Sequence, residues 1–301
     1  MPCRPDDASI LFPRMTKRTF LTCGDVAGWL ETLAPPRLAE DYDNVGLLVG
    51  EPATPVRGIL IALDITPEVL AEAHRLGANL VISHHPIWFR SRKTLRGDDF
   101  VSQQILYAIR HDLCLYACHT NLDSIRQGVN ATLVDRLGLT GVEFLQPRSD
   151  VATTHHSDFC EAGTGMIGEL PAPVRAAELL TNVQRIFGCA CIRHSRVDSE
   201  KPLRRIAVCG GAGSFLLDVA RARGADAFIT ADVTYHHFFE TCGELLFMDI
   251  GHYESEQFTS EVLRDYLANK IDANAGSFET PPAPRITETL TNPVRYFTGK
   301  F

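Results

Sequence analysis

The stretch VISHHP, residues 81–86, is a short apolar run that ends in two adjacent histidines and a proline. The apolar residues predict a buried strand, and Pro86 prevents the strand from continuing, so His84 and His85 are expected at a turn. Sheets of α/β proteins bind ligands at the carboxyl ends of their strands, which is where this pair would lie. Taken alone, such a pair is more often an incidental polar strand end.

The flanking sequence predicts a strand–helix–strand unit. Residues 58–63 form an apolar run bounded by glycine. Thr66, Pro67 and Glu68 then predict a helix start, because they supply a capping hydroxyl, a proline at the first helical position and an early acid. The helix is expected to stop at Gly77, before a strand over 79–83. Such units are parallel and right-handed.

The same unit recurs later in the chain at one constant offset. The matched pairs are ILIA (59–62) with IAVC (206–209), LGAN (76–79) with RGAD (223–226), and IS (82–83) with IT (229–230). LYACH (115–119) likewise aligns with MDIGH (248–252). We therefore predict an α/β fold of two similar domains that arose by internal duplication, with a site between them.

The expected boundaries follow from this repeat. They are a disordered tail over 1–18, a first α/β half over 19–145, a second half over 146–272 and a C-terminal tail over 273–301. Additional strands near 166–170 and 189–193, flanking a helix over 174–187, are expected in the second half only. The C-terminal tail is expected to pack as an edge strand or to contact a neighbouring molecule.

Composition narrows the class of protein. The 301 residues carry a net charge of −8, which argues against general attraction to nucleic acid. No run approaches the roughly 20 apolar residues that span a bilayer. The nine cysteines do not form the paired Cys-x-x-Cys motifs of structural zinc sites, so we expect reduced core thiols. A cytoplasmic protein without a membrane partner is expected.

Three motifs share the chemistry of metal ligands. His119 and Asp123 are four residues apart, as are His252 and Glu256, and both pairs follow apolar strands. Residues at this spacing share one face if a helix begins there, so they can bind a common ion. Imidazoles and carboxylates without cysteine favour divalent zinc, iron or manganese over a purely structural zinc site.

The number of candidate ligands indicates two ions. One catalytic metal usually takes three protein ligands, whereas the motifs supply five or six. Two ions about 3.5–4 Å apart, bridged by a carboxylate and a water of lowered pKa, account for this number better. Each histidine separately is more often a satisfied polar strand end, and the repeated placement at strand ends is what favours the metal.

Other polar groups have two interpretations each. Tyr235, His236 and His237 either contact substrate and donate protons or begin a polar helix. Asp64 is a candidate to orient a ligand from outside the centre. The basic residues of 90–96 could clamp a phosphate, although a solvated loop is favoured. The run GGAGS (210–214) resembles an anion-binding loop but equally fits a tight turn. His155 and His156 receive no role.

These motifs carry a resemblance to a known family. DNVGL (43–47), SHHP (83–86), HTNLD (119–123) and GHYESE (251–256) resemble the signature blocks of the NIF-three-like, or YbgI-like, family, whose bacterial members are commonly labelled GTP cyclohydrolase type 2 homologues. The resemblance runs from about residue 20 to 271. It implies two similar α/β domains, a dinuclear metal centre and a toroidal homohexamer built as a trimer of dimers.

The resemblance also implies roles for single residues. The metal ligands would be His84, His85, Asp123, His252 and Glu256. His119 would orient a ligand or the substrate. Both tails depart from the shortest family members.

Two functions of different classes follow. The first is a dinuclear-metal hydrolase of a nucleotide or another phosphorylated small molecule, in which His119 or His236 handles protons. The label of GTP cyclohydrolase would require opening a purine ring, and similar sites also cleave phosphoesters. The alternative is a non-enzymatic ring-shaped scaffold that binds nucleic acid or a partner protein, which the acidic charge disfavours.

Overall fold

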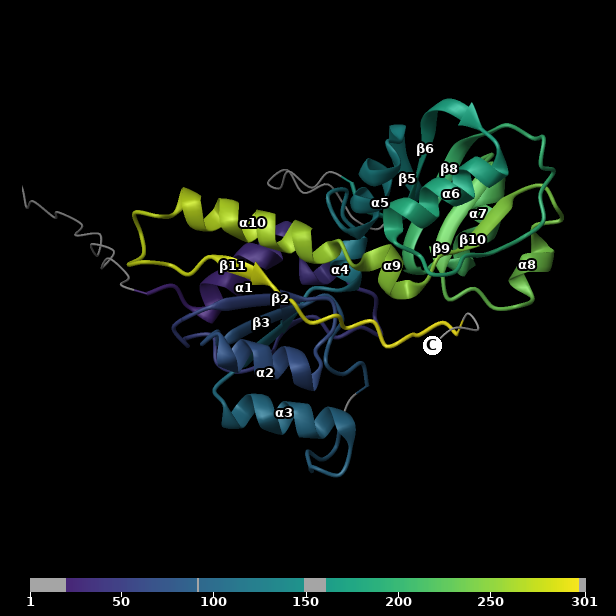
Figure 1. The fold of residues 1–301 in the computed structure, drawn as a ribbon. Coiled ribbons are helices and arrows are strands. Elements are labelled where there is room, and N and C mark those ends of the chain that lie inside the picture. The colour runs from purple at the N-terminus through teal and green to yellow at the C-terminus, as the bar shows by residue number, and fades with distance from the viewer. Residues whose placement is uncertain (1–19, 91, 149–160, 298–301) are drawn as a thin grey trace, which may run out of the picture.

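The computed structural model describes residues 20–90, 92–148 and 161–297, and the chain forms two α/β lobes, each built around one sheet (Figure 1). The first sheet belongs to the lower lobe of that view and the second to the upper right lobe. The expected tail over 1–18 and the pair His155 and His156 lie outside the described residues. The mixed α/β class predicted from the sequence is confirmed.

The first sheet has five strands in the order β1-β4-β3-β2-β11. They are β1 (Gly46–Val49), β2 (Ile59–Ala62), β3 (Leu80–Ser83), β4 (Cys114–Ala117) and β11 (Pro284–Ile286). All neighbouring pairs except β1 with β4 are parallel, so the carboxyl ends of β2, β3 and β4 lie along one edge. The predicted strands over 58–63 and 79–83 are therefore present.

Helices cover both faces of this sheet, and short polar side chains cap the starts of three of them. They are α1 (Cys23–Leu33), α2 (Pro67–Arg75) and α3 (Phe100–Arg110). Thr22, Thr66 and Asp99 accept backbone N–H groups at these starts, which satisfies donors that have no partner inside the helix. Helices α2 and α3 bury one face of the sheet, and α1 buries the other.

The second sheet has six strands in the order β5-β6-β8-β9-β10-β7. They are β5 (Thr140–Pro147), β6 (Gly163–Val174), β7 (Arg193–His194), β8 (Leu203–Ala212), β9 (Ala227–Ala231) and β10 (Leu246–Asp249). Strands β8, β9 and β10 are parallel, as β2, β3 and β4 are. An internal duplication would produce the same order of these three parallel strands in both sheets, as is seen here. The duplication itself stays a prediction.

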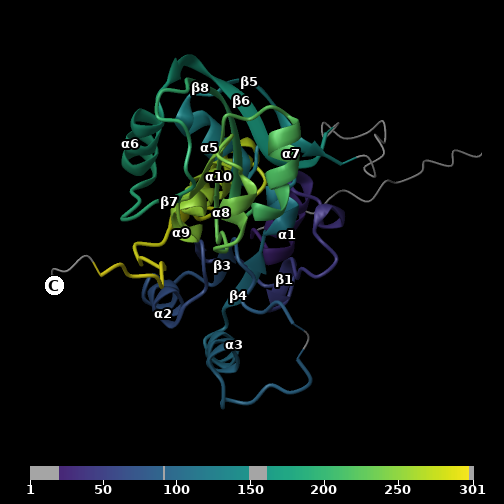
Figure 2. The ribbon, with the colours of Figure 1, turned by 90° about the vertical axis from the view of Figure 1, so that its right-hand side faces the viewer.

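Each sequence half contributes one helix to the core of the other lobe. Helix α5 (Val129–Leu137) follows the first sheet in sequence, but its Leu133 and Leu137 pack in the core of the second sheet with α6 (Ala176–Phe187). Helix α10 (Thr259–Ala273) follows the second sheet, and its Leu263 and Leu267 pack under the first. Figure 2 shows α5 and α10 running between the two sheets. This exchange ties the lobes together beside the site.

Several local predictions need adjustment. The strand expected over 189–193 is limited to β7, because residues 189–192 form no strand. The run 210–214, expected as an anion-binding loop or a tight turn, is mostly strand. Strand β8 continues to Ala212, and a single turn over Ser214–Leu216 precedes α7 (Leu217–Ala222). The C-terminal tail supplies an edge strand, β11, as expected, while residues 292–297 continue without strand structure.

No helix in the described part of the chain is both long and apolar enough to cross a bilayer.

Candidate metal centre

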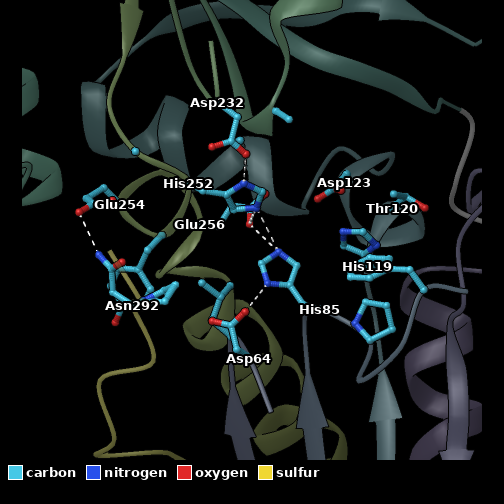
Figure 3. Close-up of a pocket in the computed structure, with 18 of the residues that line it drawn as sticks. Asp64, His85, His119, Thr120, Asp123, Asp232, His252, Glu254, Glu256 and Asn292 are labelled. Carbon is cyan, nitrogen blue, oxygen red and sulfur yellow. Dashed lines mark hydrogen bonds and ion pairs between the residues drawn. The ribbon is translucent and has the colours of Figure 1, made fainter. Parts of the chain in front are cut away.

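The three sequence motifs meet where the carboxyl edges of the two sheets face one another (Figure 3). His84 and His85 follow β3, and His119 follows β4 and precedes α4 (Thr120–Asp123). The second lobe supplies α9 (His252–Glu256), which follows β10. Parallel strands place their carboxyl ends at a common edge, which explains why residues distant in sequence converge. The structure thus brings together all five predicted ligands and His119.

One group of nitrogen and oxygen atoms centres on the second lobe. His85 Nε2 and His252 Nε2 each lie 3.0 Å from the same oxygen of Glu256, Oε2. The two nitrogens lie 3.2 Å from each other. His252 and Glu256 share one turn of α9, as their spacing predicted. A metal cation is well suited to this position, since both imidazole nitrogens and the carboxylate oxygen could coordinate the same ion.

A second group lies beside it and uses the same carboxylate oxygen. His84 Nε2 lies 3.6 Å from Asp123 Oδ1 and 3.8 Å from Glu256 Oε2. Both His84 Nε2 and Asp123 Oδ1 are buried atoms without a hydrogen-bond partner among the described residues. Because leaving buried polar atoms unpaired costs about 1–3 kcal/mol each, these atoms fit a metal ion. Glu256 belongs to both groups and can bridge two ions.

The outer nitrogens of the four histidines are all held by oxygen atoms. The Nδ1 atoms lie near the Cys118 carbonyl (His84, 2.8 Å), Asp64 (His85, 2.7 Å), Asp43 (His119, 2.8 Å) and Asp232 (His252, 2.7 Å). An oxygen that accepts a hydrogen bond from Nδ1–H fixes the proton on Nδ1. In the neutral ring the lone pair of Nε2 is then free to bind a metal, which is the usual arrangement of a metal-binding histidine. All four histidines therefore present Nε2 toward the centre, where a metal would bind it after displacing any proton there.

The electrostatics of the centre favour a cation. Burial lowers the pKa of His85, but hydrogen bonds with Asp64 and Glu256 outweigh it and raise this pKa to about 9. The pKa of His252 is raised to about 11, because Asp232 and Glu256 outweigh its burial in the same way. Burial and the negative charge of Glu256 raise the pKa of Asp123 to about 7. The cluster of carboxylates thus attracts positive charge, either protons or metal.

Metal binding at neutral pH is therefore expected to release protons. In the metal-free protein His85 and His252 are protonated at pH 7, since both pKa values lie above it. A metal must displace these protons, so we expect release of about one proton per histidine and an affinity that rises with pH from 6 to 8. Calorimetry of zinc binding in buffers of different ionisation enthalpy measures this. Binding without a buffer-dependent heat would contradict it.

Glycines next to the centre make room for Glu256. An added Cβ at Gly211 would lie 2.4 Å from Glu256 Oε1, and Gly211 also has φ of +61°. The backbone N–H groups of Gly210, Gly211 and Gly213 are already donated to Asn130, Ser255 and Thr230. No N–H group of these three glycines is free to hold an anion, and residues 210–212 continue strand β8, so the run is a strand end and fits neither the anion-binding loop nor the tight turn.

Two important residues were not singled out from the sequence. Asp43 lies in the quoted DNVGL block, and its fully buried carboxylate holds His119 and also accepts the N–H group of Thr120. Asp232 occupies the repeat position that corresponds to His85, and it holds His252 instead. The sequence could have pointed to Asp232, because it replaces a histidine at a position where the two halves otherwise repeat. Asp64, proposed from the sequence to orient a ligand, contacts His85 as expected.

Other predicted candidates lie away from the centre. His236 does not line the cavity and precedes the short helix α8 (His237–Glu240), so the structure matches the alternative of a polar helix start. In the basic loop, Arg92 pairs with Asp99 and Arg96 pairs with Asp98. None of the basic residues of 90–96 lines the cavity. The interpretation as a solvated loop is thereby favoured over a phosphate clamp.

The centre opens into a cavity of about 990 Å³. Its walls come from both lobes and from the C-terminal segment. Aromatic side chains surround the polar centre: Tyr42, Phe89, Phe100, Phe215, Tyr253 and Tyr296. Small-molecule sites typically combine such an apolar wall with a few convergent polar groups. The cavity therefore has the size and chemistry to accept a small organic molecule next to the candidate ligands.

A family model and curated relatives both match most of this chain. Residues 21–282 match the family described as Duf34/NIF3 (NGG1p interacting factor 3). Among curated relatives, the "GTP cyclohydrolase 1 type 2 homolog" of Clostridium perfringens is 36% identical over 253 residues, which cover 83% of this chain and 92% of the relative. The protein with the same name from Streptomyces coelicolor is 34% identical, with coverages of 88% and 90%.

Solved structures share the fold. A Bacillus cereus protein described as related to NIF3 superposes with a TM-score of 0.83 at 22% identity, covering 93% of this chain and all of that one. A hypothetical protein of Staphylococcus aureus gives a TM-score of 0.79 at 27% identity, with coverages of 92% and 99%. Residues 21–282, which match the family model, include every motif of the candidate centre. The chain belongs to the Duf34/NIF3 family.

Proposed function

We propose that this protein is a metal-dependent hydrolase with two divalent ions per chain, acting on a nucleotide or another phosphorylated small molecule. The observation that carries the proposal is the pair of buried, unpartnered atoms His84 Nε2 and Asp123 Oδ1 beside the group of His85, His252 and Glu256. Two sets of three ligands that share one carboxylate are what a dinuclear site requires.

The residues fall into two proposed ligand sets. His85, His252 and Glu256 would hold one ion, and His84, Asp123 and Glu256 the other. Bound divalent ions of this kind lower the pKa of water and neutralise negative charge that develops on a phosphoryl or carbonyl oxygen. Asp64 and Asp232 would keep His85 and His252 in the tautomer that presents Nε2. Zinc, iron and manganese all suit these donors.

The substrate class follows from the cavity. A polar centre at one end of an aromatic wall suits a molecule with one anionic group and one planar or apolar group. The curated relatives are named as homologues of a GTP cyclohydrolase, a name in keeping with a nucleotide. Among the Lys and Arg residues of the described part of the chain, only Arg193 lines the cavity, and it pairs with Asp249, so the metals would supply most of the positive charge for a phosphate.

His119 is proposed to hold or transfer a proton at the substrate. Its ring lies beside His84 and His85, with ring centroids 5.1 and 5.3 Å away, and Asp43 fixes its Nδ1. We expect His119→Asn to lower metal-dependent turnover of a nucleotide or phosphoester by about 10²-fold, the typical contribution of a general acid or base. Metal content, measured by elemental analysis, is expected to stay unchanged.

His236→Asn serves as the matched control, because this histidine was the other sequence candidate and does not line the cavity. Its turnover should equal that of the unmodified protein. If His119→Asn loses metal, His119 is a ligand and not a proton carrier. If His236→Asn is the inactive variant, the assignment of His119 is wrong.

A non-enzymatic ring remains the second candidate, and exposed aromatic residues favour an assembly of some kind. Tyr235 and Phe239 are 70% and 64% exposed and contact each other on the surface of the second lobe. We propose that such surfaces build the homohexamer, a trimer of dimers, that the resemblance to the family implies. Light scattering of the metal-loaded protein tests this. A hexamer that binds metal but hydrolyses no nucleotide or phosphoester would favour the ring over the enzyme.

A further inference from the structure

The C-terminal segment over residues 287–296 spans both lobes. It leaves β11 at the edge of the first sheet and runs below α9 toward the second lobe, as the yellow trace of Figure 1 shows. The segment lies outside the residues that match the family, which end at 282. Four of its residues line the cavity: Asn292, Pro293, Val294 and Tyr296. We call residues 287–296 the C-terminal strap.

The strap is anchored to the first lobe at Glu72 of α2. Thr289 Oγ1 donates a hydrogen bond of 2.8 Å to this carboxylate, and the backbone N–H group of Glu288 donates another of 3.0 Å. The hydroxyl of Thr287 donates a third. Glu72 is only 5% exposed, so these contacts satisfy a buried charge. Glu72 does not line the cavity.

The next anchor connects the strap to a proposed metal ligand. Thr291 Oγ1 donates a hydrogen bond of 2.8 Å to Asp64 Oδ2. The other oxygen of Asp64 holds His85 Nδ1 at 2.7 Å. Thr291 is 8% exposed, so water has little access to replace its hydroxyl. A buried chain of hydrogen bonds therefore leads from the strap through Asp64 to His85.

The last anchor lies on the second lobe. Asn292 Nδ2 donates a hydrogen bond of 3.1 Å to Glu254 Oε1. Glu254 belongs to α9, between His252 and Glu256, and is 7% exposed. Consecutive residues of the strap thus contact Asp64 of the first lobe and Glu254 of helix α9 in the second. Figure 3 shows Asn292 and Glu254 on one side of the centre with Asp64 below it.

We infer that the C-terminal strap is a structural part of the metal centre, in which Thr291 is a positioning residue that fixes Asp64 and, through it, the ring of His85. This inference rests on the proposed metal site. Thr291 lies outside the residues that match the family model, which end at 282. Residues that orient a metal-binding histidine from outside typically change metal affinity by 10–100-fold. Thr291 acts one hydrogen bond further out, so the lower end of this range applies.

The test compares two threonines of the strap. Thr291→Ala and Thr289→Ala each remove one hydroxyl that donates a 2.8 Å hydrogen bond to a carboxylate. Only the first carboxylate, Asp64, contacts a proposed ligand. The full chain is loaded with zinc, and the rate of zinc release to excess EDTA is measured. We expect release from Thr291→Ala to be about tenfold faster than from the unmodified chain, and release from Thr289→Ala to be unchanged.

Thr291→Ser keeps the hydroxyl and is expected to restore the slow release. Thermal unfolding of all variants separates a general loss of stability, which both alanine variants would share, from a specific effect on the centre. Equal release from both alanine variants, or no change in either, would overturn the role of Thr291. If the unmodified chain binds no zinc, iron or manganese, the proposed metal site fails instead, and the two failures are thereby distinguished.

Discussion

Glu256→Gln is expected to lose both metal ions and all metal-dependent turnover. Glu256 Oε2 lies 3.0 Å from both His85 Nε2 and His252 Nε2 and 3.8 Å from His84 Nε2. It is the one residue that belongs to both proposed ligand sets. The substitution keeps the shape of the side chain but removes its charge, and a neutral amide is a poor ligand for zinc.

The expected loss of metal affinity in Glu256→Gln can be estimated from the role of Glu256 as a bridging ligand. Loss of an orienting residue alone costs 10–100-fold in affinity, so loss of a bridging ligand should cost more than about 100-fold at each position. Elemental analysis after dialysis, together with zinc titration, measures this. Thermal unfolding checks that the variant stays folded, because Glu256 pairs with the protonated His85 and His252 in the metal-free chain, and removing one partner of a buried ion pair costs about 3–5 kcal/mol.

Glu178→Gln provides the control, since this glutamate is exposed on α6 and does not line the cavity. Its metal content should equal that of the unmodified chain. A Glu256→Gln variant that retains two ions would show that Glu256 is not a bridging ligand.

Gly211→Ala is expected to lower metal affinity by at least about tenfold although it changes no proposed ligand. The added Cβ would lie 2.4 Å from Glu256 Oε1 and 3.3 Å from His252 Cε1. One side chain must move, and Glu256 is confined by burial. The φ of +61° adds a backbone cost of about 1 kcal/mol for any residue with a Cβ.

Gly224→Ala separates the two effects. Gly224 has φ of +71°, and an added Cβ there meets nothing within 4 Å. Urea denaturation should show a loss of about 1 kcal/mol of unfolding free energy for Gly224→Ala and a larger loss for Gly211→Ala because of the collision. Only Gly211→Ala should bind zinc more weakly. Equal zinc affinity of the two variants would mean that Glu256 is free to move and that the collision is unimportant.

The sequence predicted those parts of the molecule that depend on local pattern. The helix beginning at Pro67 and the strand ending at Ser83 are determined by capping, apolar runs and proline, and the structure contains both. The convergence of His84 and His119 followed from the rule that parallel strands end at one edge, and the addition of His252 followed from the site expected between the two repeated halves. The exact set of five proposed ligands came from the resemblance to the family, and their role as ligands stays a proposal.

Features that depend on distant contacts could not be predicted. The hydrogen bond of Asp43 with His119 joins residues 76 positions apart, and that of Thr291 with Asp64 joins residues 227 apart. No periodicity in the sequence connects such pairs. The exchange of α5 and α10 between lobes was also hidden, since an amphipathic helix shows that it has a buried face but not which sheet covers that face.

The possible roles of His236 and of the run 210–214 show a related limit. A histidine after a strand and a cluster of glycines are both compatible with a ligand site or with a turn, and only the surrounding atoms decide. His236 is placed outside the cavity, and the N–H groups of three glycines in the run are occupied by Asn130, Ser255 and Thr230. Residue type alone did not contain this information.

The central claim is that the two lobes hold two divalent ions between them. The most direct test is elemental analysis of the purified, untagged chain before and after reconstitution with zinc, manganese or iron. We expect close to two ions per chain, because two proposed ligand sets share Glu256. A chain that binds no ion after reconstitution would contradict it.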